Sequence, residues 1–163
     1  MTDRFIYTVM DDPRALPLIE ALSADYIRLY GAEYGEDAAL EMTRYPAARF
    51  TPPEGAFLLL QRDGVTIGGG AFKSYGRETG TAEFKRIWVH DDFRRQGLAQ
   101  AILVELEAQA ARQGYRRVYL TTGFRQAAAT ALYRTTGYTP LFDVNADLKT
   151  LLKLPFEKTL TPG

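Results

Sequence analysis

Cysteine is absent from this sequence, and histidine occurs once, as His90. Without cysteine the chain has no disulfide framework, no zinc-thiolate site and no thiolate nucleophile. The single imidazole excludes a metal site built from several histidines, and a Ser-His-Asp triad would have to use His90 itself. These absences remove much of the covalent and metal-dependent chemistry of enzymes, and we expect no metal site.

An excess of charge and a long apolar run are also absent. The 20 Lys and Arg residues balance 20 Asp and Glu residues, so we expect no broad charge-driven binding to nucleic acid or membrane. The longest clean apolar run, residues 56–60, is far too short to cross a membrane, and the first residues lack the pattern of a secretion signal. With 163 residues, 46% of them hydrophobic, the sequence predicts one cytoplasmic domain over residues 1–163.

Hydrophobic periodicity and turn residues predict a mixed α/β domain in which helices cover a sheet. Strands are expected at residues 5–9, 56–62, 65–73, 81–90, 117–121 and 154–160. Helices are expected from residue 13 to a stop at Gly31, and at residues 36–44, 97–113 and 126–136. Asp63-Gly64 indicates a two-residue hairpin turn, because both positions need positive φ. The glycine run 68–70 is expected to mark a bulge or a close backbone approach within its strand.

The most informative segment is residues 83–99, E-F-K-R-I-W-V-H-D-D-F-R-R-Q-G-L-A, which has the pattern of a strand, a basic loop and a helix. The first amides of a helix lack internal partners and, together with the helix dipole, favour an anion. Arg94 and Arg95 add charge, and Gly97 lets the backbone approach a phosphate closely. A diphosphate would suit such a site. The alternative is a solvated loop with an ordinary turn glycine, and these features alone do not separate the two.

Three segments of the chain resemble a known family. The run R-R-Q-G-L-A at residues 94–99 is similar to the R/Q-x-x-G-x-G/A signature of the GNAT superfamily of N-acetyltransferases. The run A-E-F-K-R-I-W-V at 82–89 resembles the fourth strand of that family, and A-L-Y-R-T-T-G-Y at 131–138 resembles its A-x-x-L-Y-x-x-x-G-F/Y segment. The resemblance covers residues 5–137. It implies an acyl-CoA N-acyltransferase fold, with a central, mostly antiparallel mixed sheet flanked by about four helices.

The resemblance also implies a reaction, in which acetyl-CoA donates an acetyl group to a primary amine within a ternary complex. Glu83 would be the general base and Tyr133 the acid that protonates the leaving thiolate. An amine with a pKa of about 10.4 needs such a base near neutral pH, and a phenol with a pKa of about 10 suits a thiolate. Direct transfer needs no covalent enzyme intermediate, which agrees with the absence of cysteine. Glu83 could instead pair with Lys85 or with a cation on a neighbouring strand, and Tyr133 could be plain helix packing.

The cofactor contacts follow from the same resemblance. The backbone of Ile87, Trp88 and Val89 would face the acyl carbonyl and the pantetheine arm. Tyr133 would also touch the cofactor, and Gln126 stands where the family often carries a cofactor-binding asparagine. The coenzyme A diphosphate would be held by seven consecutive residues: Arg94, Arg95, Gln96, Gly97, Leu98, Ala99 and Gln100.

The acceptor would meet the first two helices and their loop, where Tyr30, Glu33 and Tyr34 lie among further acidic residues. We hypothesise a cationic amine, either a small molecule or a lysine or N-terminal amine, held by carboxylates and aromatic faces. The alternative is an acidic helix start that complements its own dipole. The chain is expected to be a monomer or a homodimer. The competing functional interpretation is a non-catalytic acyl-CoA-binding sensor or interaction module on the same fold.

Overall fold

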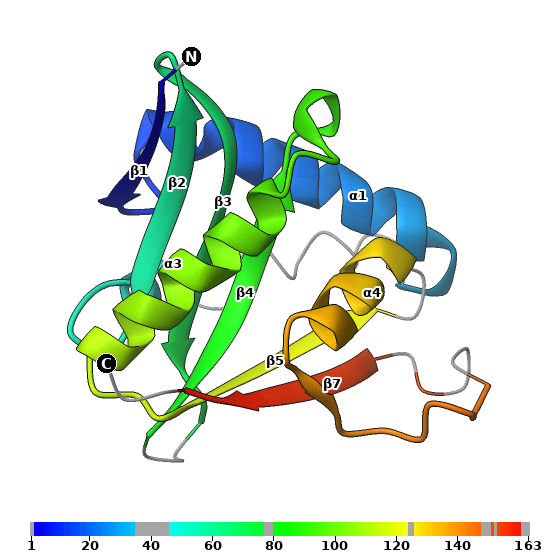
Figure 1. The fold of residues 1–163 in the computed structure, drawn as a ribbon. Helices are drawn as coiled ribbons and strands as arrows, with labels where there is room; N and C mark the ends of the chain where they lie inside the picture. The colour runs from blue at the N-terminus through cyan, green and yellow to red at the C-terminus, as the bar shows by residue number, and fades with distance from the viewer. Residues whose placement is uncertain are drawn as a thin grey trace.

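A computed structural model of the chain describes residues 2–34, 46–76, 80–123, 126–147, 151 and 153–160. Its centre is a seven-stranded sheet with the strand order β1-β2-β3-β4-β5-β7-β6 (Figure 1). The strands are β1 (Asp3–Thr8), β2 (Ala56–Arg62), β3 (Val65–Ser74), β4 (Thr81–Val89), β5 (Arg117–Gly123), β6 (Thr139–Pro140) and β7 (Lys153–Thr159). The β4–β5 pair is parallel and the other five pairs are antiparallel, which confirms the expected mixed sheet.

Helices cover both faces of the sheet. α1 (Leu16–Tyr34) lies on one face, and α3 (Leu98–Arg112) and α4 (Ala127–Thr135) lie on the other (Figure 1). Three short 3-10 helices, η1 (Pro13–Ala15), η2 (Ala47–Phe50) and η3 (Asp91–Phe93), join these elements. The further helix predicted at 36–44 lies outside the described residues. Within the described residues, no helix is long and apolar enough to span a membrane.

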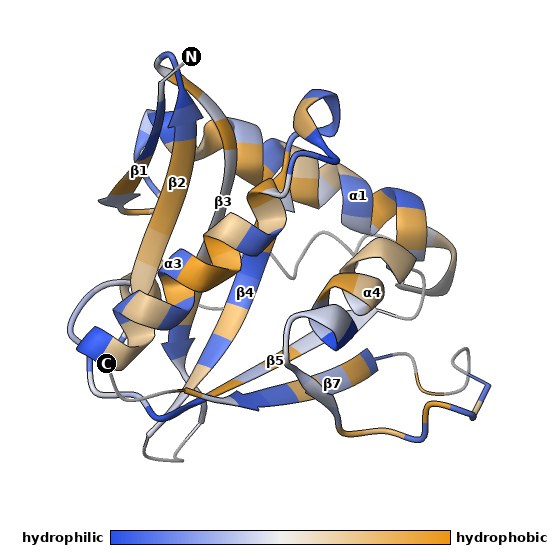
Figure 2. Cartoon of the chain, viewed as in Figure 1, coloured by the Kyte–Doolittle hydropathy of each residue, from blue (hydrophilic) through white to orange (hydrophobic). Residues whose placement is uncertain are grey.

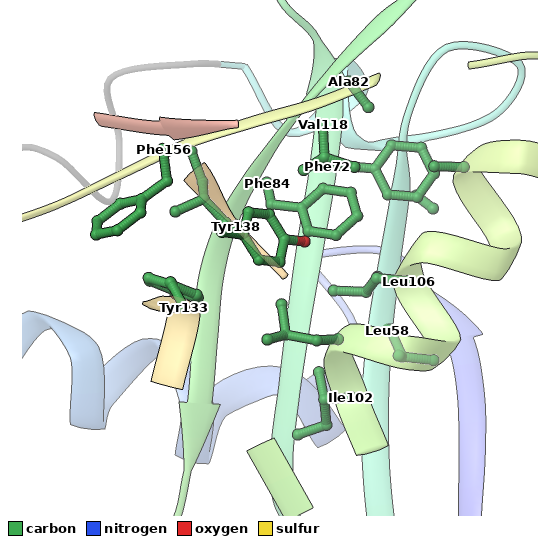
Figure 3. Packing of buried hydrophobic residues seen from close by; sticks show 14 of the residues in the cluster. Leu58, Phe72, Ala82, Phe84, Ile102, Leu106, Val118, Tyr133, Tyr138 and Phe156 are labelled. Carbon is green, nitrogen blue, oxygen red and sulfur yellow. The ribbon is translucent and has the colours of Figure 1, made fainter. Parts of the chain in front are cut away.

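The two faces carry two hydrophobic clusters. On the α3 face, Phe72 and Phe84 of the sheet pack against Ile102 and Leu106 of α3, whose apolar side points to the sheet (Figures 2 and 3). On the α1 face, buried side chains of the helix, η2 and the sheet pack together: Leu18, Leu22, Phe50, Phe57, Leu59, Ala71 and Trp88. Because strand side chains alternate between faces, these clusters also assign a face to each polar residue between them.

The glycine run in β3 is a place of close approach, as predicted. A Cβ at Gly69 would lie 2.5 Å from the Leu58 carbonyl oxygen and 2.7 Å from Leu18 Cδ1. A Cβ at Gly70 would lie 2.8 Å from Leu106 Cδ1. The β3–β4 register also shifts between Gly69 and Ala71, as in a β-bulge. The glycines therefore let both helix layers pack directly on the β3 backbone.

One local prediction was wrong, and one strand was missed. The first helix does not stop at Gly31 but continues to Tyr34. A glycine inside a helix costs only about 1 kcal/mol relative to alanine, and packing offsets that cost. The short strand β6 was not predicted, because two residues that include Pro140 give no alternating pattern.

Candidate active site

The central feature of the site is the separation of β4 from β5. The two strands pair through Thr81–Phe84 and Arg117–Leu120, and beyond these residues their described pairing ends. The later part of β4 continues to pair with β3, and the later part of β5 pairs with β7, so the strands diverge (Figure 1). The bulge at Arg86, whose φ is 62°, marks the start of the divergence. Backbone N–H and C=O groups along the diverging edges are thus placed to bind a ligand.

The loop after β4 contains two left-handed residues and leads into the first turn of α3. His90 Nδ1 accepts a hydrogen bond from the Asp92 amide at 3.1 Å and so caps η3. Arg95 and Gly97 both adopt left-handed conformations, with φ of 66° and 74°. The first backbone hydrogen bond of α3 runs from the Ala101 amide to the Gly97 carbonyl at 3.1 Å. The amides of residues 98–100 therefore precede the helical ladder and, with the helix dipole, form an electropositive edge.

The side chains of this loop are solvent-exposed. Arg94 forms an ion pair with Asp91 at 2.8 Å, and both partners are exposed. Arg95, Gln96 and Gly97 are exposed as well. The exposed side chains agree with a solvated loop, and the amides that precede the helical ladder are those an anion site would use, so the choice between the two interpretations stays open. The first interpretation concerns the side chains of this segment, and the second concerns its backbone amides.

Glu83 lies in the middle of β4 on the α1 face and is buried. Its Oε1 lies 2.7 Å from Lys73 Nζ of β3, the residue directly opposite in the register, and its Oε2 lies 3.9 Å from Lys85 Nζ. The side chains of Lys73 and Glu83 are only 4% and 10% exposed. The ion pair weighed as an alternative at the sequence level is therefore present, with Lys73 as the nearer partner. The ion pair fixes the carboxylate in one orientation. The role of Glu83 as a base stays a prediction.

Two tyrosines extend this polar row. Tyr119 of β5 is directly opposite Glu83 in the parallel register and stacks on Tyr75, with ring centroids 4.1 Å apart. Burial, then a hydrogen bond with Tyr75 and the nearby Glu83 charge, raise the pKa of Tyr119 to about 12. The tyrosine pair is half-buried beside the carboxylate. The sequence analysis missed Lys73, Tyr75 and Tyr119. The alternation of side chains along their strands is visible in the sequence, but the register that places them beside Glu83 is not.

Tyr133 lies on the opposite face of the sheet from Glu83. It projects from α4 into the α3-face cluster, 6% exposed, with its ring centroid 5.6 Å from those of Tyr138 and Phe156 (Figure 3). Burial raises the pKa of its phenol well above the ordinary value, and the nearby Tyr26 adds to the effect. The hydroxyl is therefore protonated near neutral pH, as an acid must be. Its packing role is real, and its role as the acid stays a prediction.

Tyr30 and Gln126 form a link at the end of β5. Gln126 Oε1 accepts hydrogen bonds from the Gly123 amide at 2.8 Å and from the Tyr30 hydroxyl at 3.3 Å. Tyr30 is 6% exposed and lies so close to Gly123 that a Cβ there would collide with its hydroxyl. These contacts join α1, β5 and α4. The predicted cofactor role of Gln126 and acceptor role of Tyr30 stay predictions, and the side chains of Glu33 and Tyr34 lie outside the described residues.

The remaining predicted residues lie along the diverging part of β4. Ile87 and Val89 pack against the α3-face cluster, and Trp88, 5% exposed, belongs to the α1-face cluster. Thr122 of β5, which the sequence did not indicate, is 7% exposed on the same face as Val118 and Leu120. Its hydroxyl is buried and has no hydrogen-bond partner among the described residues. Thr122 lies beyond the last residue that pairs with β4, so a ligand between the strands would supply the missing partner.

The comparisons with known proteins agree with this geometry. The model of the acetyltransferase (GNAT) family matches residues 17–138, and this chain belongs to that family. An IAA acetyltransferase from Azospirillum brasilense is 32% identical over 121 residues, which are 74% of each chain. The protein is therefore an acyltransferase of the GNAT type.

Solved structures show the same fold. A protein from Klebsiella pneumoniae assigned as an acyl-CoA N-acyltransferase is 25% identical, with a TM-score of 0.74 over 98% of this chain and 99% of that one. A protein from Salmonella typhimurium assigned as an acetyltransferase, solved with its cofactor acetyl-CoA, is 19% identical. Its TM-score is 0.72, and the match covers 99% of this chain and 95% of that one.

Proposed function

We propose that this protein is an acetyl-CoA-dependent N-acetyltransferase, one domain over residues 1–163, that acetylates a primary amine by direct transfer. The observation that carries the proposal is the placement of Glu83 and Tyr133 on opposite faces of the sheet, beside the strands that diverge. A molecule held between β4 and β5 would have a carboxylate on one side and a protonated phenol on the other. The reaction needs a base that reaches the amine nitrogen and an acid that reaches the sulfur, and groups on two sides of a bound thioester can serve these two proton transfers.

The chain's residues fit coenzyme A. The diphosphate suits the outward amides of residues 98–100, the left-handed loop at Arg95 and Gly97, and the charge of Arg94. The backbone of Ile87 to Val89 and the buried Thr122 hydroxyl would bind the pantetheine arm between the strands. When bound, acetyl-CoA supplies a thioester carbonyl that an amine can attack. The acetyl-CoA in the Salmonella typhimurium relative supports this assignment.

The chemical work of the chain is the movement of two protons. Glu83 takes a proton from the amine, directly or through one water, so that the nitrogen lone pair attacks the acetyl carbonyl. The C–N bond forms, the C–S bond breaks, and Tyr133 donates its proton to the leaving sulfur. The second proton on nitrogen leaves to solvent, from which Tyr133 is reprotonated as Glu83 loses its own proton. A backbone N–H near Ile87 would stabilise the negative charge that develops on the carbonyl oxygen.

The acceptor is proposed to bind on the α1 face, where Glu83 and the Tyr75–Tyr119 pair lie. The aromatic pair favours an amine with a flat or apolar body, whether a small molecule or a lysine or N-terminal amine on a peptide. Amines with an aromatic or apolar body are therefore the first compounds to test.

The test is an amine panel with acetyl-CoA, read as release of free thiol. On the best acceptor, Glu83→Gln is expected to lower kcat by about 10²–10⁴-fold and Tyr133→Phe by at least about tenfold. Glu20→Gln, exposed on α1, and Tyr7→Phe, on β1, are matched controls expected to keep wild-type turnover. If both site variants kept full turnover, the assigned roles would be wrong. If coenzyme A stabilised the protein and no amine were acetylated, the acyl-CoA sensor would replace the enzyme.

A further inference from the structure

Arg62, the last residue of β2, connects the anion-binding loop to the edge of the sheet. Its Nε and Nη2 donate to the Asp3 carboxylate of β1 at 2.6 and 2.9 Å. Its third nitrogen, Nη1, donates to Gln96 Oε1 at 2.9 Å. The guanidinium carbon lies 5.4 Å from the centroid of the Phe93 ring. One side chain thus contacts β1, η3 and the loop before α3.

The geometry of Arg62 is fixed by its partners. Its side chain is 11% exposed, and the bidentate contact with Asp3 holds the guanidinium plane in one orientation. The Arg62 guanidinium holds the pKa of Asp3 below its usual range, and Asp3 in turn raises the pKa of Arg62. Because the Asp3 carboxylate neutralises it, Arg62 presents a directed N–H donor to the loop rather than an unbalanced positive charge.

The contact reaches the loop between its two left-handed residues. Gln96 lies between Arg95 and Gly97, both with positive φ, and a non-glycine residue such as Arg95 adopts that conformation at an energetic cost. Gln96 is itself exposed, so no burial of its own holds it. The Arg62 bond is a tether across 34 residues of sequence that keeps the left-handed turn in place. A loop ordered in advance loses less conformational freedom when an anion binds.

We infer that Arg62, held by Asp3 and Phe93, is a positioning residue for the coenzyme A diphosphate, which it serves by fixing the 95–97 loop through Gln96. The inference rests on the proposed function, because it assumes that this loop binds the diphosphate. Arg62 acts on the affinity for the donor and on no proton transfer. Its role therefore separates from those of Glu83 and Tyr133 in kinetics.

The experiment compares Arg62→Met, Arg62→Lys and Gln96→Ala with wild type, using coenzyme A binding by calorimetry and acetyl transfer to the best amine. Arg62→Met and Gln96→Ala are each expected to raise the Kd of coenzyme A and the KM of acetyl-CoA about 5–10-fold, because the loop is no longer ordered in advance. For Arg62→Met, the kcat and the KM of the amine stay unchanged. Arg62→Lys does not restore the affinity, because an ammonium cannot reproduce the planar fork that spans Asp3 and Gln96. Arg112→Met, at the far end of α3, is the matched control and keeps the wild-type Kd.

Two readouts distinguish positioning from a structural or a charge effect. S-acetylpantetheine lacks the diphosphate, so its kcat/KM is expected to be the same in wild type and Arg62→Met. The salt dependence of coenzyme A binding is expected to keep its slope, because no phosphate loses a formal charge partner. A wild-type Kd for coenzyme A in folded Arg62→Met overturns the inference, as does an equal loss with S-acetylpantetheine. If wild type itself bound no coenzyme A, the proposed function would fail instead.

Discussion

The buried Lys73–Glu83 pair allows a stability prediction that is independent of catalysis. Removing one partner of a buried ion pair leaves an uncompensated charge and typically costs about 3–5 kcal/mol, whereas removing both together is often close to neutral. The two side chains are 4% and 10% exposed, and their charged atoms are 2.7 Å apart. Glu83 also has Lys85 at 3.9 Å. Because Coulomb attraction falls with inverse distance, this second contact retains about 0.7 of the attraction of the first.

Lys73→Met is therefore expected to destabilise the fold by about 3 kcal/mol, at the low end of that range, since Lys85 still balances the carboxylate. Glu83→Gln is expected to cost about as much, because it leaves the Lys73 ammonium without its carboxylate partner. The double variant is expected to lose only about 1–3 kcal/mol, so that the coupling energy is several times the error of the measurement.

The assay is urea denaturation of the four proteins, followed by circular dichroism, with the m-value required to stay constant. An exposed pair serves as the control cycle: Arg28 and Asp25 lie 3.2 Å apart with side chains 66% and 35% exposed. Arg28→Met and Asp25→Asn are expected to couple by less than about 1 kcal/mol. If Lys73→Met and Glu83→Gln were additive within about 0.5 kcal/mol, the pair would not act as a unit and the reasoning would be refuted.

Three further predictions concern packing and pH. Gly69→Ala is expected to destabilise the fold by about 1–3 kcal/mol, because its Cβ would lie 2.5 Å from the Leu58 carbonyl oxygen. Gly31→Ala has only Ile27 Cγ2 nearby, at 3.8 Å, and is expected to stabilise the fold by about 0.5–1 kcal/mol. Thermal melts compare the two variants with wild type. The raised pKa of Tyr119 means that its contribution to stability is complete below the unfolded pKa of 10.0 and is lost as pH rises through about 12. In a tyrosinate absorbance titration, Tyr119→Phe should remove one phenol from that window, and an unchanged titration would contradict the assignment. The lowered pKa of Asp3 means that its contribution is present above 3.8 and is lost as pH falls below that value, so Asp3→Asn should flatten the acid limb of the stability profile.

Much of the framework was predictable because it follows from local chemistry. The six long strands begin or end within two residues of their predicted positions, and the Asp63-Gly64 turn has φ of 51° and 83°, as an alternating pattern around Asp-Gly requires. The loop before α3 was recognisable because charge, glycine and helix start are adjacent in sequence. These features depend on neighbours within a few residues.

The missed features depend on register and on contacts between distant residues. The alternation of side chains along the strand predicts that Glu83 and Lys85 share a face. It does not predict that Lys73 lies opposite Glu83 on β3. The same limit hid Tyr119 beside Glu83 and the bond from Arg62 to Gln96. A one-residue shift in the β3–β4 or the β4–β5 pairing would break the corresponding contact of Glu83. The bulge at Arg86 lies beyond Glu83 and places Ile87 and Val89 on the α3 face, opposite to Glu83. The sequence contains no local signal for it, since arginine at positive φ is unusual.

The bulge at Arg86 lies where β4 separates from β5 in the candidate active site. In an unbroken parallel pair, β4 and β5 would satisfy each other's backbone groups and leave no place for a ligand. The bulge at Arg86 redirects β4, while β7 continues to pair with β5 as far as Gly123, so the two strands diverge. In the function proposed here, Glu83 on the α1 face and Tyr133 on the α3 face would then reach one bound molecule from two sides. In the proposed reaction, a base on one face and an acid on the other would serve the amine and the sulfur within one ternary complex.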